Sequence, residues 1–157
     1  MRQKKHRVIE INNMLKSLKF SEQEICRLFH TLDDFGRYRI ADGTLSVCFL
    51  DSGNMCAVHA RFLSDNTLTD VITFPGNQDF GLAGEICVSP DYAYGATKRY
   101  NTSFSEELTL YLIHGYLHLS GLNDIHEQDI VKMRQGEQEC MDLLKSLSLV
   151  PTFTMQQ

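Results

Sequence analysis

The segment that most constrains the fold is an apolar stretch from Thr109 to Leu119 that contains two histidines four residues apart. Side chains at positions i and i+4 project from one face of an α-helix, a single turn apart. His114 and His118 can therefore reach one metal ion. Gly121 follows the apolar stretch and is typical of a helix end. The sequence thus predicts a largely buried helix that carries two metal ligands and then ends in a turn.

The turn after this helix can bring a third ligand back to the same metal. His126 lies shortly beyond Gly121, and zinc binds imidazole nitrogen readily. Three protein ligands with a fourth position open are typical of catalytic zinc sites rather than structural ones. We therefore expect a metal-dependent hydrolase.

The residue after the first histidine argues against a zinc protease. Those enzymes carry glutamate at that position, where it acts as general base. Here the position is Gly115, which cannot accept a proton. A metal can still polarise a phosphoryl or carbonyl oxygen without that glutamate.

Length and composition indicate one domain over residues 1–157, with the basic segment 1–7 and the tail 151–157 expected to be flexible. No apolar run is long enough to span a membrane, and no signal-peptide core follows the basic start. The five cysteines are scattered and form no CxxC pair, which favours reduced thiols and a cytoplasmic protein. The net charge of −5 argues against a broad basic surface for nucleic acid.

The order of predicted elements indicates an α+β fold in which helices cover a small mixed sheet. Alternating or β-branched runs predict the strands, and Pro75 is expected to end the third of them. Apolar spacing predicts the helices, and Ser21, Ser89 and Ser103 are predicted N-caps. The expected strands are 8–11, 45–50, 70–74 and 84–88, and the expected helices are 21–32, 54–63, 90–100, 103–121 and 127–147.

Three segments together resemble the YbeY family of bacterial endoribonucleases. They are His114-Gly-Tyr-Leu-His118-Leu-Ser-Gly121, the Thr69-Asp-Val-Ile-Thr-Phe-Pro75 segment and the Gly84-Glu-Ile-Cys-Val-Ser-Pro90 segment. The resemblance covers roughly residues 45 to 130, in matching order and spacing.

This resemblance implies a zinc-dependent endoribonuclease that cleaves single-stranded RNA. It also implies a four-stranded mixed sheet and one Zn²⁺ held by three histidines on the central helix and the following turn. The implied partners are ribosomal RNA, especially the 3′ end of the small-subunit 16S RNA, and the small ribosomal subunit, with a part in ribosome quality control. Neither a membrane nor DNA is an expected partner.

The chain departs from the family pattern at two positions. The family's third histidine stands ten residues after the first, where this chain has Asp124. An insertion that makes His126 the third ligand is preferred, and Asp124 as an oxygen ligand is the alternative. The family also carries an arginine where this chain has Leu63.

Arg61, two residues before Leu63, is therefore the predicted phosphate anchor, and the alternatives are another cation in its place or a weakened activity. Glu85 is the predicted proton carrier. A second hypothesis is a non-catalytic ribosome assembly factor whose metal fixes the fold. A third, less favoured because of Gly115, is a relative of the metalloproteases.

Overall fold

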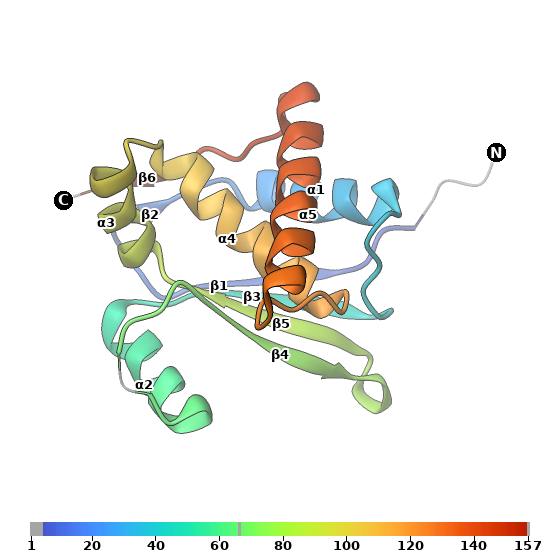
Figure 1. Ribbon diagram of the computed structural model, residues 1–157, viewed down its shortest axis with the longest axis horizontal. Coiled ribbons are helices and arrows are strands. Elements are labelled where there is room, and N and C mark those ends of the chain that lie inside the picture. The colour runs from blue at the N-terminus through green and yellow to red at the C-terminus, as the bar shows by residue number, and fades with distance from the viewer. Residues whose placement is uncertain (1–4, 66, 157) are drawn as a thin grey trace.

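A four-stranded mixed sheet is the centre of the molecule (Figure 1). The computed structural model describes residues 5–65 and 67–156. The strand order is β1-β3-β5-β4, in which the β1–β3 and β3–β5 pairs are parallel and the β5–β4 pair is antiparallel. The strands are β1 (Ile9–Asn13), β3 (Thr44–Phe49), β4 (Val71–Asn77) and β5 (Leu82–Val88). The predicted α+β class with a small mixed sheet is confirmed.

Helices occupy both faces of this sheet but unequally. Four of them, α1, α3, α4 and α5, lie above the sheet in Figure 1, and α2 lies below it. Their bounds are α1 (Glu22–Phe35), α2 (Ser52–Leu63), α3 (Pro90–Tyr100), α4 (Phe104–Leu119) and α5 (Glu127–Ser146). Among the described residues, no helix is both long and apolar enough to cross a membrane.

Strand alternation divides the buried residues between these two faces. Val47 and Ile86 belong to the main core beneath α1, α4 and α5, whereas their neighbours Cys48 and Cys87 pack with a smaller cluster that includes Met55 of α2. Successive side chains of a strand point to opposite faces of a sheet. Residues of β3 from Leu45 and of β5 from Gly84 can therefore be assigned to the α4 side or the α2 side by their position along the strand, whereas Ala83, at a register shift, packs with the main core.

Local signals in the sequence placed most element boundaries. Ser21, Ser89 and Ser103 each accept a backbone hydrogen bond at the start of a helix, as predicted. The expectation that Pro75 ends its strand was wrong, because β4 continues to Asn77. The strand β4 lies at the edge of the sheet, where a residue without an N–H is tolerated. A short 3₁₀ turn (Gln78–Phe80) then connects β4 to β5.

The C-terminal tail is packed rather than frayed, which corrects the prediction for residues 151–156. Phe153 is only 3% exposed and lies against Phe20 and Phe49. The short strands β2 (Leu18–Lys19) and β6 (Thr154–Met155) form an antiparallel pair. Burial of an aromatic ring stabilises the tail in a way that local pattern does not reveal. At the other end, Arg7 of the predicted flexible segment 1–7 is held by an ion pair with Asp33 at 2.6 Å. Residues 1–4 and 157 lie outside the described residues.

Candidate metal centre

Helix α4 presents His114 and His118 on one face, as predicted from their spacing. Their rings are 4.4 Å apart between centroids and nearly perpendicular. Gly115, between them in sequence, faces the sheet instead. A Cβ atom at this position would lie 2.5 Å from Cγ2 of Ile86 on β5. The close approach of α4 to β5 therefore leaves no room for the glutamate that a zinc protease carries here.

The Nδ1 atom of each histidine lies within hydrogen-bond distance of a group that accepts and does not donate. For His114 this group is a carboxylate, and for His118 it is a main-chain carbonyl. His114 Nδ1 lies 2.9 Å from a carboxylate oxygen of Glu137 on α5. His118 Nδ1 lies 3.0 Å from the main-chain oxygen of Leu122. These partners fix the proton of each neutral ring on Nδ1. The Nε2 lone pairs of both rings are left available for a ligand.

Asp124 completes the group from the turn between α4 and α5. Its carboxylate oxygens lie 3.4 Å from His114 Nε2 and 3.8 Å from His118 Nε2. The ligand atoms of His114, His118 and Asp124 all lie within 4.8 Å of one another. Two nitrogen atoms and one carboxylate thus converge on a common point.

This donor set fits a zinc ion. Tetrahedral ligands at metal–N and metal–O bond lengths of roughly 2.0–2.2 Å are separated by about 3.3–3.6 Å. The distance of 3.4 Å between His114 and Asp124 falls in that range, and the 3.8 Å to His118 is slightly longer. A histidine whose other nitrogen donates to a carboxylate or carbonyl is the usual arrangement of a metal-binding imidazole. The chemistry of the residues present therefore matches a bound divalent metal.

Burial and neighbouring charges set the protonation states of Glu137 and His118 that favour binding of a cation. Burial raises the pKa of Glu137, but the hydrogen bonds from His114 and Arg134 outweigh it and lower the pKa below its ordinary value. Glu137, which is only 4% exposed, is thus held as a carboxylate. Burial first, and then the neighbouring His114, lower the pKa of His118. Its ring is accordingly held in the neutral form that binds metal.

The histidines open into a polar cavity of about 520 Å³. Four carboxylates line it and are opposed by two arginines, Arg99 at the end of α3 and Arg134 on α5. The carboxylates belong to Asp70, Glu107, Asp124 and Glu137. An anionic substrate would be repelled by this acidic lining, whereas a divalent cation would offset it.

Comparison with known proteins then places the chain in a family. Residues 10–145 match the family described as Endoribonuclease YbeY. The chain belongs to this family. An endoribonuclease YbeY from Protochlamydia amoebophila is 37% identical over 109 residues, which are 67% of this chain and 73% of that protein. Another, from Azobacteroides pseudotrichonymphae, is 29% identical over 69% of this chain and 78% of its own length.

A solved structure supports the fold. The solution structure of TM1509 from Thermotoga maritima matches with a TM-score of 0.63 at 23% identity, covering 90% of this chain and 92% of that one. The predicted resemblance to the YbeY family is therefore confirmed, and with it the predicted enzyme class, since the relatives are named endoribonucleases, which are hydrolases.

The structure places the alternative third ligand, Asp124, in the metal group, and it does not bring His126 there. His126 is exposed and occupies the N-cap of α5, where its main-chain oxygen accepts a hydrogen bond from Ile130 at 2.9 Å. Asp124 stands ten residues after His114, the position of the third histidine in the YbeY pattern. The arrangement thus favours replacement of that histidine over a two-residue insertion.

The two predicted catalytic residues lie away from the histidines. Gly84 and Ile86 of β5 face α4, where they meet Leu119 and Gly115. Glu85, which lies between them, therefore points to the α2 side of the sheet, where it bonds Ser46. Arg61 is exposed on α2, with its guanidinium over the ring of Phe62. Neither residue is among the described residues that line the cavity.

Sequence reasoning missed Glu137 and Arg134, and it did not assign Arg99 to the metal site. The first two are spaced i and i+3 on α5 and form an ion pair at 3.0 Å, a spacing that the sequence displays. What it does not display is the packing of α5 on α4, which brings Glu137 to His114 across 23 residues of chain. Only the tertiary structure makes these three residues part of the site.

Proposed function

We propose that this protein is a zinc-dependent endoribonuclease that cleaves single-stranded RNA at the cavity beside α4. The observation that carries the proposal is the convergence of His114 Nε2, His118 Nε2 and the Asp124 carboxylate. The names of the relatives supply the substrate class. We propose these three residues as the ligands of one Zn²⁺ ion, which would supply Lewis-acid stabilisation to the negative charge that develops on a phosphate during cleavage.

The chain's own residues hold and orient this group. Glu137 fixes the ring of His114, and the Leu122 carbonyl fixes the ring of His118. Arg134 lies beside Glu137 and lines the cavity with His114. Its side chain is largely exposed, so the guanidinium can turn from Glu137 toward a phosphate. Bidentate arginine–phosphate pairs are strong and directional.

Arg99 and Tyr100, at the end of α3, extend the site along an RNA strand. Arg99 lines the same cavity as the histidines, and its guanidinium lies 5.9 Å from the centre of the Tyr100 ring. The Tyr100 ring is 69% exposed. Exposed aromatic rings stack unpaired bases, and neighbouring cations contact the backbone. This pairing supports the proposed preference for single-stranded over duplex RNA.

Arg99 and Arg134 supply the positive charge that the arginine of the YbeY pattern would supply. Leu63 is 58% exposed at the end of α2 and offers no charge. The absence of an arginine at position 63 favours the alternative hypothesis, a non-catalytic ribosome assembly factor. Because Arg99 and Arg134 already line the metal cavity, cleavage does not require a cation at position 63 or 61.

The proposed physiological substrate is ribosomal RNA in the cytoplasm, with the 3′ end of the small-subunit 16S RNA as the site of maturation. Association with the small subunit and a part in ribosome quality control belong to the same proposal. The small subunit's RNA would hold the enzyme near its substrate, which the net charge of −5 does not do by itself.

The ligand assignment is tested by the zinc content and zinc affinity of Asp124→Ala and His126→Ala. Both side chains are well exposed, so both variants are expected to fold. Asp124→Ala should lose zinc on dialysis while His126→Ala retains it. The reverse result would restore His126 as the third ligand.

The activity is tested on a labelled single-stranded RNA, its duplex form and the same sequence as DNA, each with and without a chelator. We expect cleavage of the single-stranded RNA alone, abolished by the chelator and by His114→Ala. Cleavage by His114→Ala at the parent's rate, or tight RNA binding with no cleavage, would refute the nuclease and favour the assembly factor.

The phosphate contacts are tested with Arg99→Ala and Arg134→Ala, for which Arg61→Ala is the matched control. Loss of one phosphate contact on a single strand lowers the slope of log affinity against log salt by about 0.7. We expect this loss for Arg99 and Arg134 and no change for Arg61. A changed slope in the Arg61 variant alone would return the anchor to α2.

A further inference from the structure

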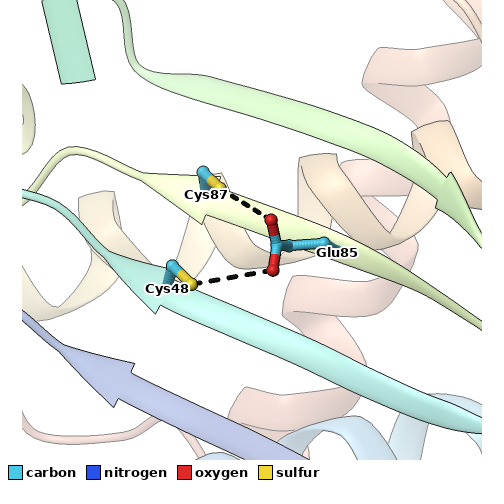
Figure 2. Close-up of side chains that lie close together, drawn as sticks. All are labelled: Cys48, Glu85 and Cys87. Atoms are coloured by element: carbon cyan, nitrogen blue, oxygen red, sulfur yellow. Dashed lines mark hydrogen bonds between the residues drawn. The ribbon is translucent and has the colours of Figure 1, made fainter. Parts of the chain in front are cut away.

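A second group of metal-binding side chains lies on the other face of the sheet. Figure 2 shows Cys48 on β3, with Glu85 and Cys87 on β5, and the carboxylate of Glu85 lying between the two thiols. The ligand atoms of the three residues all lie within 4.8 Å of one another. We propose that these residues form a second metal site, for a thiophilic divalent cation such as Zn²⁺.

The distances fit a single tetrahedral ion. Cys48 Sγ lies 3.9 Å from one carboxylate oxygen of Glu85, and Cys87 Sγ lies 3.7 Å from the other. Zinc–sulfur bonds of about 2.3 Å and zinc–oxygen bonds of about 2.1 Å place neighbouring S and O ligands about 3.6 Å apart. Small rotations of three side chains are enough to surround an ion.

The backbone holds these ligands in place. Cys48 and Cys87 are directly opposite each other in the parallel β3–β5 pair. Glu85 is two residues before Cys87 and so shares its face of the sheet. The hydroxyl of Ser46 donates to Glu85 Oε2 at 3.0 Å, which orients the carboxylate as an outer partner orients a metal ligand.

Charge also favours a cation at this point. Among the residues that the structure describes, no lysine, arginine or histidine forms an ion pair with Glu85. Cys87 is 3% exposed and packs with Met55 and Ile72. A divalent cation coordinated by the two sulfur atoms would balance the negative charge of the Glu85 carboxylate.

The surroundings match a metal site that remains reachable. Cys48 and Glu85 are half-buried, so an ion has a path from solvent, and a water molecule can take the fourth position. Thiolate ligands select zinc and other soft ions over Mg²⁺ or Ca²⁺. Binding replaces the two thiol protons, which are released to solvent.

Cobalt(II) distinguishes this site from the one on α4. Thiolate ligation gives Co²⁺ an intense charge-transfer absorption in the near ultraviolet, which histidine and carboxylate ligands do not give. We expect reduced, metal-free protein to develop this band with Co²⁺, and Zn²⁺ to remove it by competition. No such band once Co²⁺ has loaded the α4 site would overturn the proposal.

Variants locate the band. The double variant Cys48→Ala/Cys87→Ala should lack it, whereas Cys56→Ala, a half-buried cysteine of α2 outside the group, should keep it. Persistence of the band in the double variant, or its loss in Cys56→Ala, would contradict the assignment. Asp124→Ala should also keep the band, so that this test is independent of the site on α4.

Glu85→Gln covers the case in which the double variant fails to fold. Its thiols are unchanged, and its affinity for Co²⁺, followed by the same band, should fall by about tenfold or more, since even outer-shell partners contribute that much. An unchanged affinity would remove Glu85 from the site. A thiol titration before and after Co²⁺ addition checks that the cysteines bind metal rather than oxidise. A fall in the number of free thiols that a chelator does not restore would indicate a disulfide and refute the proposal.

Discussion

Glu137→Gln tests whether α5 sets the metal affinity of the histidines on α4. The carboxylate of Glu137 accepts from His114 Nδ1 at 2.9 Å and from Arg134 at 3.0 and 3.3 Å. Glutamine has the same shape, but its amide offers one oxygen in place of two and carries no charge. Because arginine only donates, the amide nitrogen forms no hydrogen bond with Arg134 when the amide oxygen accepts from His114. One set of hydrogen bonds is lost, and the basicity of the His114 ring falls.

The expected effect is on zinc affinity rather than on folding. Removal of an outer-shell partner costs about 10- to 100-fold in metal affinity, which is about 1.4–2.7 kcal/mol. Glutamine still accepts from His114, so a value near tenfold is expected. A buried neutral amide costs less to desolvate than a carboxylate, and this offsets part of the lost hydrogen bonding. The free energy of unfolding of the metal-free protein should therefore change by less than about 1 kcal/mol.

The assay is a zinc competition titration against a chromophoric chelator, with thermal unfolding in excess chelator as the folding check. Asp142→Asn is the matched control, because it makes the same chemical change on an exposed position of the same helix. Its zinc affinity should equal the parent's. If Glu137→Gln binds zinc within about twofold of the parent, where a tenfold loss is expected, Glu137 does not tune the metal.

Three further changes test the packing of α4 on β5, the packing of the C-terminal tail and the second metal group. Gly115→Ala puts a methyl group 2.5 Å from Ile86 and should lower the free energy of unfolding by about 1–3 kcal/mol. Its control, Gly95→Ala, has open space around it and should leave the free energy of unfolding unchanged or raise it by up to about 1 kcal/mol. Equal melting temperatures for the two variants would contradict this. Phe153→Ala should cost about 3–5 kcal/mol in urea unfolding, and a cost below about 1 kcal/mol would show that the tail is not part of the core. Ser46→Ala should leave folding nearly unchanged, within about 1 kcal/mol, but weaken the cobalt thiolate band, which a spectroscopic titration measures.

Much of the fold was predictable because its signals are local. The i, i+4 spacing of His114 and His118, the caps at Ser89 and Ser103 and the β-branched strands all act within a few residues. The tail was predicted wrongly because its stabilisation comes from β2, more than a hundred residues earlier in the chain. Pairing over that distance leaves no periodic trace in the sequence.

The candidate site was predictable only in part, because two of its features depend on tertiary packing. The choice between Asp124 and His126 is decided by where α5 begins, since His126 takes the N-cap position. Glu85 was assigned to the wrong face, because a β-strand without an assembled sheet does not show which side will meet the histidines. The contact of Ile86 with Gly115 settles that question in the folded protein.

That contact also restricts the paths by which such a chain could evolve. Placing glutamate at position 115, which a zinc protease would need, first requires a smaller side chain at 86, and each change alone harms the protein. The glutamate collides with β5, and a shortened Ile86 leaves a cavity under α4. The effects of substitutions at positions 115 and 86 therefore depend on each other, and either single variant is expected to be less stable than the parent. The packing of α4 on β5 therefore excludes a glutamate at position 115 as long as Ile86 is present.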